Sequence, residues 1–402
     1  MMTNGSFQTN SYDLICFSHL RWDFVFQRPQ HLMTRFAGEH RVFFIEEPIY
    51  GDDGPRLEVT SRENGLSVVQ PHLPPGCDVD AVMCSLVAGL RDEKNIGDCV
   101  LWFYTPMMLR WADRLEPTAI VYDCMDELSM FRGAPPELIK REEELFQRAE
   151  LVFTGGQSLF EAKRGKHRAV YAFPSSIDVK HFEKALSVCE EPSDQHGIPH
   201  PRIGFCGVID ERTDIDLLSR IAELRPDFHY VMLGPVVKID ENDLPRRANI
   251  HYLGAKKYDE LPAYIGGWDV AMMPFALNDA TRFISPTKTP EYLGAGRPVV
   301  STPIRDVVRP YGEKGLVHIA ATAEEFVQAI ETALIEPDGT RKAKAAEHLA
   351  KMSWEKTQRA MAELIDEVVE NSAVELSPLT LDGRRRFPAT LDTLPTQEER
   401  YV

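Results

Sequence analysis

The chain has 402 residues and a formal net charge of −17, with 45 Lys and Arg against 62 Asp and Glu. Its 43% hydrophobic and 27% charged residues are typical of a soluble globular protein, which excludes a wholly disordered or fibrous chain. An acidic surface repels a phosphate backbone, so the charge argues against a dedicated nucleic-acid-binding protein. The length predicts two domains.

The sequence favours a cytoplasmic protein. It has no stretch near the ~20 apolar residues that span a bilayer, and residues 1–11 lack the pattern of a secretory signal. The seven cysteines are scattered and form no CxxC pair, which indicates reduced thiols rather than a zinc site or a disulfide framework.

Short apolar runs alternate with longer amphipathic segments along the chain. In the first half we expect strands over residues 12–18, 41–46, 99–104, 119–122 and 151–154. Two helices are expected between them, over residues 28–37 and 137–149. The second half repeats the pattern, with strands expected over residues 202–206, 229–233, 250–253, 269–274 and 298–301. Its helices are expected over residues 215–224, 259–265 and 289–295. Helices are also predicted over 322–334, where Thr322 and Glu325 have capping-box spacing, and 345–370. The fold class is therefore α/β, with parallel sheets covered by helices on both faces.

Residues 190–201 contain three prolines and several polar residues, which indicates a linker between two halves. We therefore predict two Rossmann-like, doubly wound domains that face a central cleft, over residues 1–190 and 191–352. A helix at about 353–371 is expected to pack back on the first domain, and residues 372–402 to form a flexible tail.

Ligands of doubly wound sheets bind beyond the carboxyl ends of the strands. Residues 278–301 combine a polar loop, a helix start, a glycine-rich helix end and a buried strand. Thr287 or Thr289 can cap this helix, whose first N–H groups, together with Lys288, would attract an anion. Glu291 could accept two hydroxyl hydrogen bonds. The alternative is that Glu291 only complements the helix dipole and Lys288 is solvated.

This segment resembles the donor-site signature of the family 4 glycosyltransferases with the GT-B fold, in the branch that reads SPxKxxEYLAxGxPVVST. The matching residues are Ser285, Pro286, Lys288, Glu291, Tyr292, Leu293, Gly296, Pro298, Val299, Val300, Ser301 and Thr302. Residues 173–178, 203–218 and 249–274 also resemble family segments, in the same order. The resemblance covers about residues 12–370. It implies that the second domain binds a nucleotide-sugar, that Glu291 binds its ribose, and that the first domain binds the acceptor.

The resemblance implies a donor site made of Gly207, Arg212, Gly234, Gly254, Ser285, Pro286, Thr287, Lys288 and Glu291. Two departures from the family occur. Phe283 stands where many members have a sugar-binding glutamate, and Val208 stands where an arginine is usual. Arg212 is then the basic candidate for the diphosphate, and the alternative is an ion pair with a neighbouring acidic residue: Asp210, Glu211, Asp214 or Asp216.

Two first-domain loops are candidates for the acceptor side. The loop 18–31 offers His19, Arg21, Trp22 and Arg28, although its aromatic residues could instead pack in the core. Asp123 and Asp126 follow the 119–122 strand, where one carboxylate could orient an acceptor hydroxyl and Asp126 could alternatively cap a helix. Gly155 and Gly156 could approach a ligand or simply form a tight turn.

The resemblance predicts a glycosyltransferase of the hexosyltransferase type that retains anomeric configuration and uses neither metal nor cofactor. Arg212 and Lys288 would stabilise the leaving diphosphate, and Asp126 would act on the acceptor. The expected partners are a nucleotide-sugar donor and a glycan or lipid-linked acceptor, with at most peripheral contact at the inner membrane face and no nucleic acid. The alternatives are a nucleotide-sugar epimerase that uses Asp123, Asp126, Glu127 or His19, and a non-catalytic binding protein, suggested by Phe283.

Overall fold

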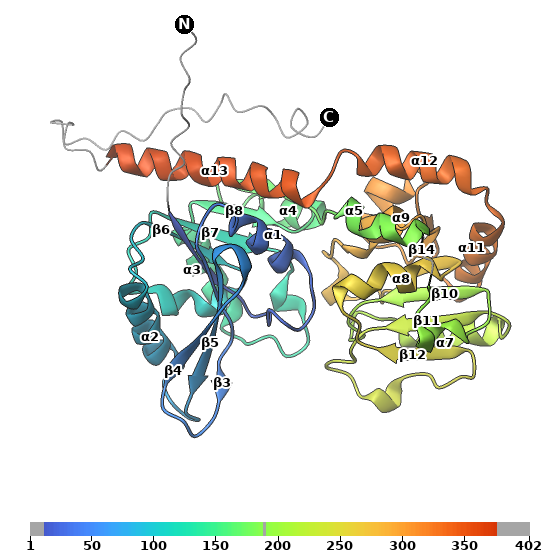
Figure 1. The fold of residues 1–402 in the computed structure, drawn as a ribbon, viewed down its shortest axis with the longest axis horizontal. Coiled ribbons are helices and arrows are strands. Elements are labelled where there is room, and N and C mark those ends of the chain that lie inside the picture. Colours follow the sequence, from blue (N-terminus) through green and yellow to red (C-terminus); the bar gives the residue numbers. More distant parts are fainter. Residues whose placement is uncertain (1–11, 188–189, 376–402) are drawn as a thin grey trace, which may run out of the picture.

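Buried strands alternate with amphipathic helices throughout residues 12–187 and 190–375, which are the residues that the computed structural model describes. The strands form two separate sheets, each flanked by helices, and Figure 1 shows the two lobes side by side. We call the lobe around the first sheet the first domain and the lobe around the second sheet the second domain. The predicted α/β class, with two Rossmann-like domains, is confirmed.

The first sheet has the strand order β3-β5-β2-β1-β6-β7-β8-β9, and β4 pairs antiparallel with β5 while the other pairs are parallel. Its strands are β1 (Asp13–Phe17), β2 (Val42–Ile45), β3 (Ile49–Tyr50), β4 (Arg56–Ser61), β5 (Leu66–Leu73), β6 (Cys99–Phe103), β7 (Ala119–Cys124), β8 (Leu151–Thr154) and β9 (Val170–Ala172). The helices of this part of the chain are α1 (Arg28–Phe36), α2 (Val79–Glu93), α3 (Leu138–Arg148), α4 (Gln157–Lys163) and α5 (Val179–Phe182).

The second sheet is parallel, in the order β12-β11-β10-β13-β14-β15. Its strands are β10 (Arg202–Cys206), β11 (His229–Leu233), β12 (Ile250–Gly254), β13 (Val270–Met273), β14 (Val299–Ser301) and β15 (His318–Ile319). The later helices are α6 (Ser193–His196), α7 (Ile215–Leu224), α8 (Leu261–Gly266), α9 (Lys288–Gly294), α10 (Arg305–Val307), α11 (Ala323–Ile335), α12 (Asp338–Leu349) and α13 (Trp354–Glu375). Thr322 and Glu325 form the predicted capping box at the start of α11.

The central strands of each sheet are buried on both faces, as is usual for parallel sheets, whereas β3 and β4 at the edge of the first sheet are largely exposed. Residues of α2 and α3 pack on one face of the first sheet, while α1 and α13 cover the other. In the second domain, α7 and α11 pack on one face, and α8, α9 and α12 on the other. The carboxyl ends of the parallel strands in each domain therefore carry the loops that the sequence singled out.

The chain crosses between the domains twice, and the first crossing lies earlier than predicted. Ile177, Phe182 and Ala185 already belong to the core of the second domain, so the chain enters that domain before residue 190. The proline-rich segment that suggested a linker contains α6 and packs on the second domain, where Gln195 is fully buried. After α12 the chain returns, and α13 runs along the first domain (Figure 1).

The sequence did not predict the β3–β5 strands or α2. The single helix predicted over 345–370 is wrong, because the chain there forms two helices, α12 and α13, with a break between Leu349 and Trp354. α13 extends to Glu375, past the predicted end at residue 371, and the remainder of the predicted tail, residues 376–402, lies outside the described residues. Among the helices that the structure describes, none is both long and apolar enough to cross a membrane.

Candidate active site

A small hollow lies between the domains, at the carboxyl ends of both sheets, and we call it the cleft hollow. Its volume is about 90 Å³. The first domain contributes Gln27, Arg28, Met125, Asp126, Gly155 and Ser175 to its wall, and the second contributes Val208, Arg212, Phe275, Ile284, Ser285, Pro286, Thr287 and Lys288. The structure therefore brings Arg212, Asp126 and the 285–288 segment together, although they are far apart in sequence.

Lys288 lies across the end of β10, where two glycines leave room for it. A Cβ atom on Gly207 would lie 2.2 Å from Lys288 Cε and 2.8 Å from its Nζ, and Gly207 has φ 151°. A Cβ atom on Gly234, at the end of β11, would lie 1.8 Å from the Gly207 carbonyl oxygen. Gly234 N–H donates to the Gly254 carbonyl at 2.8 Å, so the three predicted glycines line up along adjacent strand ends. Both close approaches require glycine.

The Lys288 ammonium is available to an anion. Burial lowers its pKa, an effect that the nearby Cys206 and Glu291 oppose. Within the described residues, Lys288 Nζ has no hydrogen bond or ion pair, and it lies 5.9 Å from the ring centroid of Phe205. A partly buried ammonium group that makes no direct contact with a carboxylate is a candidate binding group for an external anion.

Arg212 lies in the same wall but has a protein partner. Its guanidinium binds Asp210, with Nε at 3.0 and 3.1 Å from the two carboxylate oxygens and Nη2 at 2.7 Å from Oδ2. The alternative of an ion pair with Asp210 is thus what the structure shows. The pair fixes the guanidinium at the hollow, and Arg212 Cζ lies 5.5 Å from the centroid of Phe131 in the first domain.

Asp126 is the carboxylate that faces these cations. Burial raises its pKa, and the charges of Arg212, Arg28 and Lys288 oppose this shift. Asp126 does not cap a helix, because the short 3₁₀ turn that follows has Glu127 at its N-cap position and no side-chain cap bond. The Asp126 carboxyl group is therefore not used as a helix cap, which was the alternative role considered for it.

Glu291 lies on α9, beside the hollow, and is only 7% exposed. Burial raises its pKa to about 8, although the Lys288 charge acts in the opposite direction. Its neighbour Tyr258 has a buried hydroxyl that lacks a hydrogen-bond partner in the described part of the chain. Burial and the Glu291 charge raise the pKa of Tyr258. The Tyr258 hydroxyl next to Glu291 is therefore a polar group without a partner among the described residues.

The start of α9 differs from the expectation. Thr287 is at the N-cap position but makes no capping side-chain bond, and the Thr289 hydroxyl instead donates to the sulfur of Met273 at 3.4 Å. Phe283, which replaces the usual glutamate, packs against the core of the first domain. This position is therefore used for contact between the domains.

Several acceptor-side predictions were wrong. Asp123 is fully buried and binds the Arg28 guanidinium at 3.0 and 2.8 Å, so Asp123 does not face the cleft. Arg28 does line the cleft hollow, but this ion pair holds its guanidinium. Arg21 donates to Glu46 and to the Glu47 carbonyl, which fixes the loop after β2. Trp22 packs edge-on against Phe44, as the core alternative proposed. Of these four predicted residues, Arg28 alone lines the cleft hollow.

His19 and two residues that the sequence did not indicate gather at one side of the cleft. Burial, together with the charge of Lys238 from the second domain, lowers the pKa of His19 to about 4, so its imidazole is neutral near pH 7. Lys238 Nζ and Arg212 Cζ each lie 5.5 Å from the Phe131 ring centroid. Phe131 follows the 119–124 strand, but nothing in the sequence indicated that Lys238 would reach it.

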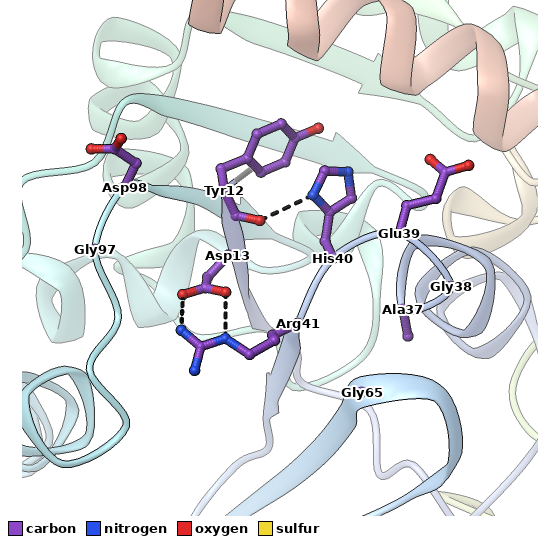
Figure 2. A pocket seen from close by; sticks show the side chains of 10 residues that line it. All are labelled: Tyr12, Asp13, Ala37, Gly38, Glu39, His40, Arg41, Gly65, Gly97 and Asp98. Carbon is purple, nitrogen blue, oxygen red and sulfur yellow. Dashed lines mark hydrogen bonds and ion pairs between the residues drawn. The ribbon is translucent and has the colours of Figure 1, made fainter. Parts of the chain in front are cut away.

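A larger hollow of about 570 Å³ lies at the opposite, amino-terminal edge of the first sheet (Figure 2). There Asp13 binds Arg41, and the His40 ring contacts the Tyr12 carbonyl oxygen at 3.0 Å. It contains none of the predicted site residues, and in open parallel sheets ligands bind at the other edge. Within residues 12–187 and 190–375, no group of three or more His, Cys, Asp or Glu side chains is arranged to hold a metal ion.

Comparison with known proteins agrees with the architecture. Residues 200–336 match the family described as glycosyl transferases group 1, and this region carries Gly207, Arg212, Lys288 and Glu291. The match covers residues 200–336 of 402, all within the second domain, which is therefore similar to the group 1 glycosyltransferases. The chain is also similar to the "Putative teichuronic acid biosynthesis glycosyltransferase TuaH" of Bacillus subtilis, 25% identical over 223 residues. That match covers 51% of this chain and 55% of TuaH, about half of each.

Solved structures are similar in fold to nearly the whole chain. Sucrose-phosphate synthase from Thermosynechococcus elongatus has a TM-score of 0.66 at 12% identity and covers 90% of this chain and 100% of its own. A UDP-forming trehalose-phosphate synthase from Burkholderia xenovorans has a TM-score of 0.66 at 13% identity, with 90% and 99% covered. At these identities the likeness shows the fold alone.

Proposed function

We propose that the protein transfers a sugar from a nucleotide-sugar donor to a glycan or lipid-linked acceptor at the cytoplasmic face of the membrane. The observation that carries the proposal is Lys288, whose ammonium lies over Gly207 at the end of β10 and makes no hydrogen bond or ion pair with the described residues. A diphosphate supplies the missing negative charge. The family match and the relative TuaH support the same reaction class.

The reaction would depend on stabilising the leaving group. When the sugar leaves, negative charge develops on the diphosphate while the sugar carbon becomes oxocarbenium-like. Lys288 and Arg212 meet this charge with donors that are fixed before the reaction, Lys288 by the glycines beneath it and Arg212 by Asp210. This role needs no metal. Glu291, next to the hollow, would bind the ribose hydroxyls.

On the acceptor side, Asp126 would orient the attacking hydroxyl and receive its proton. Its raised pKa makes it a stronger base than an ordinary carboxylate. Following the family resemblance, we propose retention of configuration by attack on the same face from which the diphosphate leaves. The Phe131 ring and His19 would border the sugar and the acceptor.

The volume of the cleft hollow implies movement. At about 90 Å³ it is smaller than the ~300–1,000 Å³ of most ligand pockets, so we infer that its walls separate before a donor enters. The donor would enter when the domains separate and react when they close, which excludes water from the reacting groups.

The first experiment is a thermal-shift screen with nucleoside diphosphates and nucleotide-sugars, because a ligand that binds the folded state raises the melting temperature. The best nucleotide-sugar is then incubated alone and with candidate acceptors. We expect slow donor hydrolysis alone and glycosidic product with an acceptor, with the anomeric configuration determined by NMR. An epimerised donor, or binding without any turnover, would contradict the proposal.

The second experiment tests the cations. Lys288→Ala and Arg212→Ala should each lower turnover roughly 100-fold, the effect of losing one donor to a developing oxyanion. Lys344→Ala, on the exposed surface of α12, is the control and should keep full turnover. Full activity in both site variants would refute the role of this cluster.

A further inference from the structure

The turn between β8 and α4 is in close contact with segments of the candidate site on both of its sides. A Cβ atom on Gly155 would lie 2.5 Å from the carbonyl oxygen of Met125, the residue before Asp126. A Cβ atom on Gly156 would lie 2.3 Å from Asp306 Oδ2 and 2.8 Å from Ser285 Cβ, both in the second domain. The two glycines are therefore required by contact between protein segments, which the sequence alone did not reveal.

Asp306 crosses the domain boundary at this turn. It lies on α10, is 5% exposed, and its two carboxylate oxygens accept hydrogen bonds from the Ser158 backbone N–H at 3.0 and 3.2 Å. Next to it, the Ser175 hydroxyl of the opposite wall donates to the Ser285 carbonyl at 2.6 Å. Hydrogen bonds to an ionised carboxylate are about twice as strong as neutral ones, so Asp306 is the stronger of these two contacts.

The other end of α4 binds the loop that carries Asp126. Lys163, the last residue of α4, is 2% exposed and binds Glu142 at 2.7 and 2.8 Å. Its Nζ also lies 2.7 Å from Oε2 of Glu127, the residue after Asp126. The Asp126 loop is thus attached to α4 on both sides, through Gly155 at one end of the helix and Lys163 at the other.

We propose that Asp306 is a positioning residue for the transfer reaction, an inference that rests on the proposed function. By binding Ser158 it holds α4 against the donor segment at Ser285 when the domains close. Because α4 carries the Asp126 loop, the same contact sets Asp126 against the donor. Asp306 itself is outside the wall of the cleft hollow and takes no part in the chemistry.

The test compares four variants of the full chain. Asp306→Ala removes the contact, Asp306→Asn keeps one acceptor oxygen, and Gly156→Ala displaces Asp306 from the first-domain side. Gly156 has an extended backbone, φ −168° and ψ 165°, so alanine there adds steric contact without backbone strain. Glu161→Gln is the matched control, because it breaks the ion pairs with Arg305 and Arg309 at the same boundary.

Three quantities are measured: the affinity for the nucleoside diphosphate selected in the thermal-shift screen, kcat and KM for turnover of its nucleotide-sugar, and backbone hydrogen exchange. In Asp306→Ala and Gly156→Ala we expect kcat to fall roughly 100-fold, as for a reacting group that is misplaced by about 1 Å, with KM and nucleotide affinity unchanged. Exchange should increase in residues 124–128 as well as 157–163. Asp306→Asn and Glu161→Gln should stay close to the parent.

The proposal is overturned if kcat is unchanged, if nucleotide affinity falls together with kcat, or if exchange increases only at residues 157–158. It is also overturned if Glu161→Gln behaves like Asp306→Ala. Should Asp306→Ala fail to fold, Gly156→Ala decides in its place. If the parent protein binds no nucleoside diphosphate, the proposed function fails, while the exchange measurements still decide whether Asp306 holds the Asp126 loop.

Discussion

Replacing Glu291 by glutamine should stabilise the protein at alkaline pH and weaken donor binding. The Glu291 carboxyl is 7% exposed, and its burial raises its pKa from 4.5 to about 8 against the opposing charge of Lys288. The folded protein therefore binds this proton more tightly than the unfolded chain does. Stability from this group is complete below pH 4.5, decreases as the pH rises, and is lost above about pH 8.

The size of the effect follows from the pKa values. At about 1.4 kcal/mol per pKa unit, a rise from 4.5 to about 8 corresponds to at most about 5 kcal/mol of unfolding free energy. Glutamine has the shape of the protonated acid and does not ionise. The variant should thus match the parent near pH 4.5 and exceed it by on the order of 3–5 kcal/mol near pH 9.

The assay is urea unfolding of both proteins from pH 4.5 to 9, with Glu347→Gln on the exposed surface of α12 as the control. Calorimetry at pH 9, where the parent carboxyl is ionised, should show weaker binding of the selected nucleoside diphosphate by Glu291→Gln, because the amide offers one oxygen acceptor fewer than the carboxylate. Higher stability with lower affinity cannot result from misfolding. The reasoning is refuted if the variant loses stability with pH as steeply as the parent, or if nucleotide affinity is unchanged.

Further substitutions test the rest of the site. Asp126→Asn should lower kcat by roughly 10²–10⁴-fold. In the parent, kcat/KM should fall as the pH drops through the raised Asp126 pKa. A pH–rate profile of the variant should lack this decrease. Gly207→Ala should push Lys288 aside and weaken nucleoside diphosphate binding about tenfold or more by calorimetry, with the melting temperature as a check on folding. Phe131→Ala should raise KM for donor or acceptor while circular dichroism stays unchanged. Ending the chain after residue 352 should expose the first-domain core and yield a product that limited proteolysis degrades rapidly. The side chain of Trp354 is fully buried, and losing it by itself costs about 3–5 kcal/mol of unfolding free energy.

The sequence predicted what depends on neighbours along the chain. The central strands of both sheets, the capping box at Thr322 and the group 1 signature are local patterns, and the fold class follows from their alternation. Lys288 and Glu291 lie within one such pattern, which is why the sequence could indicate them as a pair.

What the sequence missed depends on distant contacts. Arg28 and Asp123 are 95 positions apart, and only the fold shows that they neutralise one another. The reach of Asp306 to Ser158 spans 148 positions, and no local spacing encodes it. The chain's early entry into the second domain was missed for the same reason, because proline content marks exposed turns and not the place where packing partners change.

α13 has a consequence for how the protein is made. Trp354, Met361 and Ile365 are fully buried in the core of the first domain, yet they lie after every strand of the second. A nascent chain leaves the ribosome from its N-terminus, and domains usually fold in that order. Here the N-terminal half must wait, with an apolar face uncovered, until the C-terminal helix has been synthesised, whereas the second domain has all its strands earlier. The first domain is therefore synthesised first but completed last.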